Sequence, residues 1–323
     1  MKSSSGFDRR SFLQTALGAA AFAALGSGMK TAGGSGRAQR DISPMPVRPL
    51  GKTGRQVCLL SLGGQATLED PARRDDAVKI IHRAIDLGVN YIDTASLYGR
   101  GASEQCIGEV MKTRRKEVFL ASKTHDRTYD GSMRLLETSL QRLQTDHLDL
   151  WQLHNLQTDI DLDFIFSREG AVKALERARE EHIVTFAGVT GHRDPFVLRK
   201  AVERYPFDTI LMAVNAADRH DASFIEHLLP IVVEKNMGIM AMKVPSRGTI
   251  FRDNGIRTME QAMRYVLSHP VSTVVIGISE IHELEENIRI AKEFKPMATD
   301  EMLRLENLTR PYFSDVLWYR DHM

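Results

Sequence analysis

Tyr91-Ile92-Asp93-Thr94-Ala95-Ser96-Leu97-Tyr98-Gly99 is the segment around which this chain is organised. The apolar run over residues 89–92 predicts a buried strand that stops at Asp93. Tyr98 follows five residues later beside a glycine, and Ser103-Glu104 then begins an amphipathic helix. A carboxylate at the end of a buried strand is costly unless a charged group pairs with it. We therefore expect Asp93 to meet a cation, and a cation there would prepare Tyr98 for proton transfer.

The same strand-then-helix unit recurs along the chain. Apolar runs predict strands over residues 56–62, 89–92, 118–123, 148–154, 184–190, 209–214, 238–243 and 273–277. Amphipathic patterns predict helices over residues 73–87, 104–112, 132–143, 170–181, 194–204, 222–235, 258–267 and 281–294, with one more helix near 300–308. Eight such units favour the α/β class and a single (β/α)8 barrel, which usually needs about 250 residues. A doubly wound open sheet is the alternative, but Gly63-Gly64-Gln65-Ala66 lacks its G-x-G-x-x-G loop.

Composition excludes several classes of function. The chain of 323 residues is 42% hydrophobic and 26% charged, and its net charge of +1 gives no reason to expect nucleic acid or an anionic membrane as a partner. The two cysteines, Cys58 and Cys106, cannot build a CxxC site or a Cys/His metal cluster. We expect buried thiols, with a single disulfide between them left open.

The first 38 residues are predicted to lie outside the fold. Asp8-Arg9-Arg10-Ser11-Phe12-Leu13-Gln14 precedes a weakly apolar run over residues 15–29, which is too short for a comfortable membrane span. This pattern resembles a twin-arginine export signal, with cleavage expected after Ala38. The resemblance implies the twin-arginine export machinery as a partner and a periplasmic or other extracytoplasmic location. Residues 39–323 then form the barrel domain, beginning with a Pro-rich linker over residues 39–49.

Polar residues close to the ends of three successive strands suggest a shared site. Asp93, Lys123 and His154 end predicted strands two, three and four, and Tyr98 follows Asp93. Because strand ends of a barrel face one mouth, these four side chains should meet there. Lys123 can pair with Asp93 and lower the pKa of the Tyr98 phenol from about 10, while His154 can hydrogen-bond a carbonyl oxygen. This set donates a proton to oxygen and contains no nucleophile with its base and no metal ligands, so it requires a cofactor as hydride or electron source.

Together with Arg48-Pro49-Leu50-Gly51-Lys52-Thr53-Gly54 ahead of the barrel, the set Asp93, Tyr98, Lys123 and His154 resembles the aldo-keto reductase superfamily over residues 46–295. The resemblance implies a barrel that binds an extended nicotinamide cofactor without a Rossmann motif. It implies reversible conversion of a small carbonyl compound and its alcohol. Tyr98 would be the acid, Lys123 and Asp93 would tune it, and His154 would position the carbonyl.

The resemblance also implies cofactor-binding residues near the last four strands. Thr190 stands at the hydroxyl of the family's Ser-Asn pair, and Asn215 is the expected substitute for the missing amide. Met242 takes the place of a stacking tyrosine, with a plain core role as the alternative. Lys243, and Arg247-Gly248 in the same loop, would meet the pyrophosphate, although Arg247 also fits a solvated loop charge.

At the last barrel helix, four residues fall where the family holds the adenosine half: Gly277, Ser279, Glu286 and Asn287. Glu283 stands where a basic residue usually holds the 2′-phosphate of NADP(H). A carboxylate there repels phosphate and accepts from a ribose hydroxyl, so weak discrimination between NADP(H) and NAD(H) is expected. No metal and no iron–sulfur cluster are expected.

Two functions of different classes follow from the sequence. The first is a reductase of aldehydes or ketones, which the complete set of four residues favours. The second is a redox-sensing or regulatory barrel that binds the cofactor with little turnover. A non-redox lyase or hydrolase is disfavoured, because neither a metal set nor a carboxylate pair is present.

Overall fold

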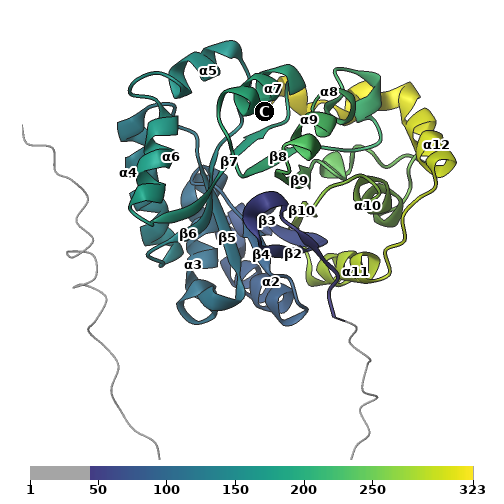
Figure 1. The fold of residues 1–323 in the computed structure, drawn as a ribbon. Coiled ribbons are helices and arrows are strands. Elements are labelled where there is room, and N and C mark those ends of the chain that lie inside the picture. The colour runs from purple at the N-terminus through teal and green to yellow at the C-terminus, as the bar shows by residue number, and fades with distance from the viewer. Residues whose placement is uncertain (1–43, 323) are drawn as a thin grey trace, which may run out of the picture. The chain divides into compact units, whose positions relative to one another are not determined.

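Eight parallel strands close into a barrel, as predicted from the sequence (Figure 1). The computed structural model describes residues 44–322, so the predicted export signal lies outside the described residues. The last strand pairs in parallel with the first, with Val274 opposite Leu60, and this pairing closes the ring. In ring order from β3 to β10, the strands are β3 Leu60–Ala66, β4 Tyr91–Asp93, β5 Phe119–Thr124, β6 Leu148–Leu153, β7 Val184–Gly191, β8 Thr209–Ala213, β9 Gly238–Met242 and β10 Thr273–Ile278.

Helices surround the barrel and follow the predicted pattern. They are α2 Arg74–Asp86, α3 Ala102–Arg114, α4 Tyr129–Leu143, α6 Ala171–Glu180, α7 Pro195–Arg204, α10 Met259–Leu267 and α11 Ile281–Lys292, followed by α12 Thr299–Thr309, α13 Phe313–Val316 and α14 Tyr319–His322. The single helix predicted over residues 222–235 is wrong. It is divided into α8 Phe224–His227 and α9 Leu229–Glu234, because Pro230 cannot continue a helix and sits instead in the first turn of α9.

One further helix, α5 Asp159–Ile165, was not predicted. Its start carries a sequence signal all the same, because Thr158 accepts from the backbone of Asp161 and Asp161 accepts from the backbone of Thr158. Reciprocal bonds of this kind satisfy amide groups that a helix start leaves unpaired. The short apolar face of α5, with Leu162 and Ile165, buries against the barrel layer.

The linker predicted over residues 39–49 is partly a strand. β1 Val47–Pro49 pairs antiparallel with β2 Gln56–Cys58, and the barrel strand β3 begins only at Leu60. Leu50 and Val57 of this hairpin are fully buried against a cluster inside the barrel that contains Tyr91, Phe119, Leu150, Leu211 and Met240. Burial of Leu50 and Val57 against the side chains inside the barrel stabilises the hairpin. Strand patterns in the sequence do not reveal these contacts.

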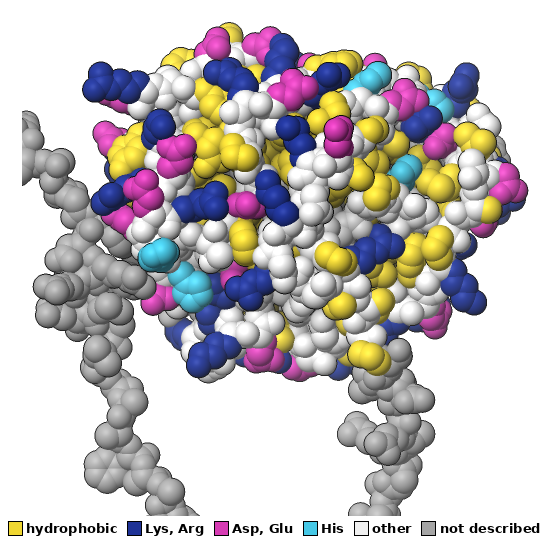
Figure 2. Space-filling view, in the orientation of Figure 1, with side chains coloured by type: hydrophobic (Ala, Val, Ile, Leu, Met, Phe, Trp, Pro, Cys, Tyr) yellow, Lys and Arg dark blue, Asp and Glu magenta, His cyan; other side chains and the backbone are white. Residues whose placement is uncertain are grey.

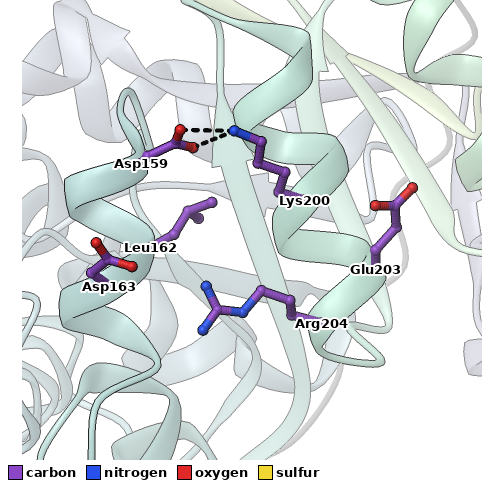
Figure 3. Close-up of a pocket in the computed structure, with 6 residues that line it drawn as sticks. All are labelled: Asp159, Leu162, Asp163, Lys200, Glu203 and Arg204. Atoms are coloured by element: carbon purple, nitrogen blue, oxygen red, sulfur yellow. Dashed lines mark hydrogen bonds and ion pairs between the residues drawn. The ribbon is translucent and has the colours of Figure 1, made fainter.

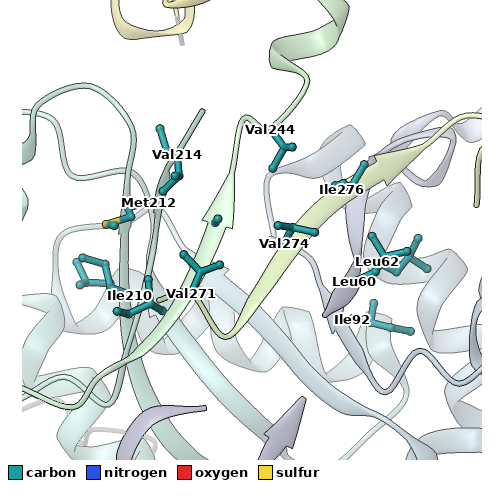
Figure 4. Packing of buried hydrophobic residues seen from close by; sticks show 14 of the residues in the cluster. Leu60, Leu62, Ile92, Ile210, Met212, Val214, Val244, Val271, Val274 and Ile276 are labelled. Atoms are coloured by element: carbon teal, nitrogen blue, oxygen red, sulfur yellow. The ribbon is translucent and has the colours of Figure 1, made fainter. Parts of the chain in front are cut away.

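A larger apolar layer lies between the strands and the helices. Side chains alternate along a strand, so one set of each strand's side chains fills the barrel and the other meets the helices. Figure 4 shows part of the outer set, with Leu60 and Leu62 on β3 and Val274 and Ile276 on β10. Cys58 and Cys106 are free and buried, which confirms the expected buried thiols.

The surface carries charges of both signs. On the face drawn in Figure 2, basic and acidic side chains are interspersed rather than gathered in separate fields. In the part of the chain that the structure describes, no helix combines the length and the apolar character that crossing a membrane requires.

Candidate functional site

The four predicted catalytic residues lie together at one end of the barrel. Asp93 is the last residue of β4, and Lys123 lies in the neighbouring strand β5, where its Nζ donates to the Asp93 carboxylate. The Lys123 ammonium lies 5.0 Å from the centre of the Tyr98 ring. The His154 ring follows β6 and meets the Tyr98 ring edge-on, with 5.6 Å between centroids. The arrangement places a phenol, an ammonium and an imidazole around one point of the mouth.

The Lys123–Asp93 ion pair is almost completely buried, with 1% and 2% of the residues exposed. A buried pair is stable only when further hydrogen bonds compensate for the lost water. Gln152 Nε2 donates to Asp93 Oδ2 over 2.9 Å, and Tyr91 Oη donates to the same oxygen over 3.3 Å. Lys123 Nζ also donates to the carbonyl of Thr94 over 2.7 Å. The pair is therefore held in one geometry from several sides.

Gln152 and Tyr91 were not selected as site residues by sequence reasoning, yet a signal for both exists. Tyr91 lies two residues before Asp93, and Gln152 lies two residues before His154. Residues two apart on a strand face the same side. Polar side chains at that spacing from Asp93 and His154 are thus expected to point into the barrel below the site.

The loop that carries Tyr98 has a fixed and unusual backbone. Gly99, Arg100 and Gly101 have φ values of 55°, 55° and 100°, in the left-handed region. A Cβ on Gly99 would lie 2.0 Å from the carbonyl oxygen of Glu69, so only glycine allows this close approach to the loop after β3. The loop conformation therefore positions the Tyr98 ring over Lys123.

A second buried carboxylate supports the same loop. Glu104, the third residue of α3, has no exposed surface and accepts from Ser122 Oγ over 2.7 Å. Arg142 pairs with Glu104 at 3.3 Å and donates to the carbonyl of Ser96 over 3.1 Å. This network joins α3, β5 and α4 to the loop between Asp93 and Tyr98. It explains why an acidic residue at the start of α3 is buried rather than solvated.

The electrostatics of Tyr98 differ from the prediction. Burial raises the pKa of the Tyr98 phenol above its ordinary value, and it outweighs the opposing effect of the Lys123 ammonium. Burial alone would lower the pKa of Lys123, but the Asp93 carboxylate and the Tyr98 oxygen reverse this and raise it. The predicted lowering of the phenol pKa is therefore wrong, because burial raises it. Both shifts favour a protonated phenol beside a charged lysine.

His154 is a neutral imidazole. Burial and the nearby Lys123 charge hold the pKa of His154 well below 6.5. Arg127 fixes the backbone here, because its guanidinium donates to the carbonyl of His154 over 2.8 Å and to that of Asn155 over 2.9 Å. A neutral imidazole can donate one N–H to a carbonyl oxygen without adding a charge. Arg127 was not selected from the sequence, since nothing marks it among other loop arginines.

The two residues predicted to hold the nicotinamide amide are buried and already have partners. Thr190, in β7, accepts at Oγ1 from the Asn155 amide over 2.8 Å. Asn215 follows β8, and its Nδ2 donates to the Lys243 carbonyl and to the Tyr319 hydroxyl, each over 3.2 Å. Tyr319 was not selected from the sequence, because it comes from the last turn of the chain, 104 residues away.

The loop after β9 holds the residues predicted to meet the pyrophosphate. Met242, the last residue of β9, packs against the cluster inside the barrel, which matches its alternative role as core. Lys243 lies 5.3 Å above the Tyr319 ring, and burial lowers its pKa to about 8. Arg247 lies 5.4 Å above the Trp318 ring. Gly248 has a φ of +89° and open space where a Cβ would be.

At the start of α11, Glu283 accepts at Oε2 from the amides of Ser279 and Glu280, over 2.8 and 3.3 Å. The carboxylate therefore lies at the helix start, where we predicted it. Glu286 instead pairs with Arg289 on the exposed side of α11, 2.8 Å apart, whereas Asn287 is buried. Gly277 lies on β10, just before an irregularity in its pairing with β3. Within residues 44–322, no three His, Cys, Asp or Glu side chains form a group that fits a metal ion.

A surface pocket lies away from these residues, between α5 and α7 (Figure 3). All six lining residues belong to those two outer helices: Asp159, Leu162, Asp163, Lys200, Glu203 and Arg204. Lys200 Nζ donates to both Asp159 oxygens, over 2.8 and 2.7 Å. None of the six is a strand-end residue, so we assign the chemistry to the barrel mouth and not to this pocket.

The chain is similar to known proteins over most of its described length. It is 26% identical to an uncharacterized oxidoreductase, YqkF, of Bacillus subtilis, covering 82% of this chain and 97% of that protein. It is 24% identical to the L-galactose dehydrogenase of Arabidopsis thaliana, covering 80% and 92%.

Solved structures share the architecture. A holo aldo-keto reductase of Bacillus halodurans superposes with a TM-score of 0.69 at 26% identity, covering 82% of this chain and 96% of that one. An aldo-keto reductase of Klebsiella pneumoniae in complex with NADPH superposes with a TM-score of 0.67 at 24% identity, covering 81% and 93%. The model of the aldo/keto reductase family matches residues 59–251, which is more than half of the chain. The chain therefore belongs to the aldo/keto reductase family of oxidoreductases.

Proposed function

We propose that this protein reduces an aldehyde or ketone to its alcohol, reversibly, with NADP(H), or NAD(H) with weak discrimination, as its cofactor. The observation that carries the proposal is the buried Lys123–Asp93 pair beneath Tyr98, with the His154 ring against the same phenol. Both partners of the pair are charged, and both reach the mouth from neighbouring strands. No purely structural need explains an ion pair, a phenol and a neutral imidazole assembled at the end of a barrel where active sites occur.

The residues of this chain divide the work of proton transfer. His154, as a neutral donor, binds the substrate carbonyl oxygen and directs it towards the Tyr98 hydroxyl. Tyr98 gives its proton to that oxygen, and the Lys123 ammonium stabilises the phenolate that remains. Asp93, held by Gln152 and Tyr91, keeps Lys123 charged and in place. When bound, the nicotinamide supplies the hydride that the carbonyl carbon requires.

The candidate cofactor residues fit such a ligand at its phosphate side. Lys243 and Arg247 are cations in one loop after β9, and Gly248 leaves open space beside them. Two phosphates would find complementary charge there. The NADPH held by the Klebsiella pneumoniae enzyme supports the choice of cofactor as a proposal for this chain. Asn215, the residue proposed to hold the nicotinamide amide, donates a hydrogen bond to the Tyr319 hydroxyl. A cofactor that binds Asn215 must replace this hydrogen bond.

Fluorescence titration with NADPH, followed by a panel of small aldehydes and ketones, tests this function. We expect saturable binding and consumption of NADPH that depends on the carbonyl compound. Binding without any turnover across the panel would favour the second function, a redox-sensing barrel. One observation supports that alternative: Met242 stands where the family places a stacking tyrosine, and it packs into the core.

We further propose that the protein is exported in a folded state through the twin-arginine pathway. The arginine pair Arg9-Arg10, the following Phe12-Leu13 and the modest apolar run support this proposal. Twin-arginine signals suit proteins that acquire a cofactor before they cross a membrane. The mature protein would then act outside the cytoplasm with its cofactor already bound.

A further inference from the structure

Residues 316–320, which we call the latch, pack onto the loops that hold the candidate cofactor residues. Tyr319 has no exposed surface, and its hydroxyl accepts from Asn215 Nδ2 over 3.2 Å. The His192 ring meets the Tyr319 ring edge-on at 5.6 Å, and Lys243 covers it at 5.3 Å. These contacts come from the loops after β7, β8 and β9. Tyr319 therefore lies at the point where three strand ends of the barrel meet.

Polar contacts anchor the latch on either side of Tyr319. Arg320 pairs with the fully buried Asp218 at 3.0 Å and donates to the carbonyl of Asp221 over 2.6 Å. Ser246 Oγ donates to the carbonyl of Val316. Both anchors lie in the loops after β8 and β9. In Figure 1 the yellow C-terminal chain runs from α12 past α8 towards the C-terminus, in agreement with these contacts.

The latch occupies one of the two N–H donors of Asn215, the residue that would hold a nicotinamide amide. An asparagine side chain has two N–H donors, and those of Asn215 go to the Lys243 carbonyl and to Tyr319. Its oxygen accepts from the Ala217 amide over 3.0 Å. Because Tyr319 is fully buried, it offers no free ring face on which a nicotinamide could stack. A cofactor amide and Tyr319 therefore compete for the same residue.

We infer that the latch closes the nicotinamide end of the cofactor site, and that the cofactor binds after Tyr319 has withdrawn from Asn215. This inference rests on the proposed function, because it takes Asn215 as a cofactor residue. The latch can leave without unfolding the barrel, since α13 and α14 span four residues each and such short helices depend on their packing. The apparent affinity for cofactor is then reduced by the fraction of molecules whose latch is open.

Titration with NADP⁺ and the rate of its binding test the inference in the full chain. The variants are Tyr319→Ala, which removes the ring, and Arg320→Met, which keeps Tyr319 but removes the anchor to Asp218. Asp321→Asn, at the exposed neighbouring position, is the control. We expect both latch variants to bind NADP⁺ roughly tenfold tighter or more, and the control to match the wild type. Thermal unfolding of each variant checks that its barrel is intact.

The rate of NADP⁺ binding and the tryptophan fluorescence test the latch without requiring turnover. In the wild type the observed binding rate should level off with NADP⁺ concentration at the rate of latch opening, whereas in Arg320→Met it should keep rising. The chain has two tryptophans, and Trp151 is fully buried in the core, so a shift in emission on NADP⁺ binding should report Trp318 in the latch.

The outcomes separate the latch from the function on which it rests. Equal affinities and linearly rising rates in all chains would overturn the latch and leave the proposed function standing. Weaker binding by Tyr319→Ala would also overturn it, because Tyr319 would then help to hold the cofactor. Failure of every chain to bind NADP⁺, NADPH, NAD⁺ or NADH would overturn both.

Discussion

At the scale of single residues, the site depends on one charge held out of water. Lys123 is 1% exposed, yet Asp93, the Thr94 carbonyl and the Tyr98 oxygen keep it charged. Its effect on the pKa of Tyr98 is smaller than that of burial, so the net shift favours the protonated phenol. In the proposed reaction, the lysine would therefore act mainly on the product of proton transfer, the phenolate, and less on the phenol.

This order of effects predicts the pH dependence of the reaction. An acid must be protonated to act, and the pKa of Tyr98 is raised from its ordinary value of 10.0, so its protonated fraction falls only above that pH. His154, with a pKa well below 6.5, is already neutral at pH 7. At saturating NADPH, we expect kcat/KM for the carbonyl substrate to be flat from roughly pH 7 to pH 9 and to fall at higher pH. A decline centred near pH 7 would show that Lys123 lowers the phenol pKa after all.

The second prediction at this scale concerns Tyr98→Phe. The change removes the proton donor and leaves the ring, so kcat for carbonyl reduction should fall by about 10²–10⁴-fold. The Kd for NADPH, measured by fluorescence titration, should stay nearly unchanged. Tyr205→Phe, at the C-terminal end of α7 away from the site, is the matched control and should behave as the wild type. Turnover by Tyr98→Phe at the wild-type rate would exclude Tyr98 as the acid.

At the scale of elements, we propose that the start of α11 influences which nicotinamide cofactor is preferred. Glu283 accepts from two backbone amides there, so its carboxylate is held at the helix start rather than free in solvent. Like charges in contact disfavour each other by about 1 kcal/mol even in water. This opposes a 2′-phosphate, and we expect NADPH and NADH to bind within about tenfold of each other, a gap of about 1.4 kcal/mol.

Substitution at Glu283 tests that expectation. Glu283→Arg should shift the ratio of the two Kd values towards NADPH and lower the stability by about 0.5–2 kcal/mol, through loss of the cap. Glu283→Gln should shift the ratio partway with little loss of stability, because glutamine can accept the same two bonds. Glu285→Gln, an exposed neighbour paired with Arg83, is the control. NADPH bound hundreds of times tighter than NADH by the wild type would reject this account of Glu283.

The elements also show which features of the molecule can be read from sequence. Alternating strand and helix patterns predict the barrel, because each unit is local and the closure follows from their number. The strand-end residues Asp93, Lys123 and His154 could be predicted for the same reason. The hairpin that carries Leu50 could not be predicted in this way. It is stabilised by packing against side chains inside the barrel that lie far away in the sequence.

Contacts between distant residues explain the remaining errors. Tyr319 and Asn215 are in contact although they lie 104 positions apart in the sequence, and the residues around each of them do not predict that contact. The pKa of Tyr98 depends on how deeply the loop buries it, which spacing along the sequence does not specify. Pro230 is the exception, because its effect on the helix after β8 is local and was available in the sequence.

At the scale of the whole molecule, the proposed export can be tested in cells. Replacing Arg9 and Arg10 by Lys should leave the protein in the cytoplasm, because the paired arginines are the feature that the export machinery reads. Arg37→Lys, downstream of the apolar run, is the control and should be exported. Cell fractionation followed by immunoblotting gives the result. Export of the double-lysine variant at the wild-type level would contradict the signal.

In the proposed reaction, this barrel transfers hydride to a carbonyl carbon and a proton from Tyr98 to the carbonyl oxygen. The most direct test uses NADPH that carries two deuterium atoms at C4 of the nicotinamide. After incubation with a panel of small aldehydes and ketones, mass spectrometry determines whether the alcohol product carries deuterium on the former carbonyl carbon. We predict one deuterium per alcohol with the wild type and at least about a hundredfold less labelled alcohol in equal time with Tyr98→Phe. Bound NADPH with no labelled alcohol from any member of the panel, or equal labelling by both proteins, would contradict the account.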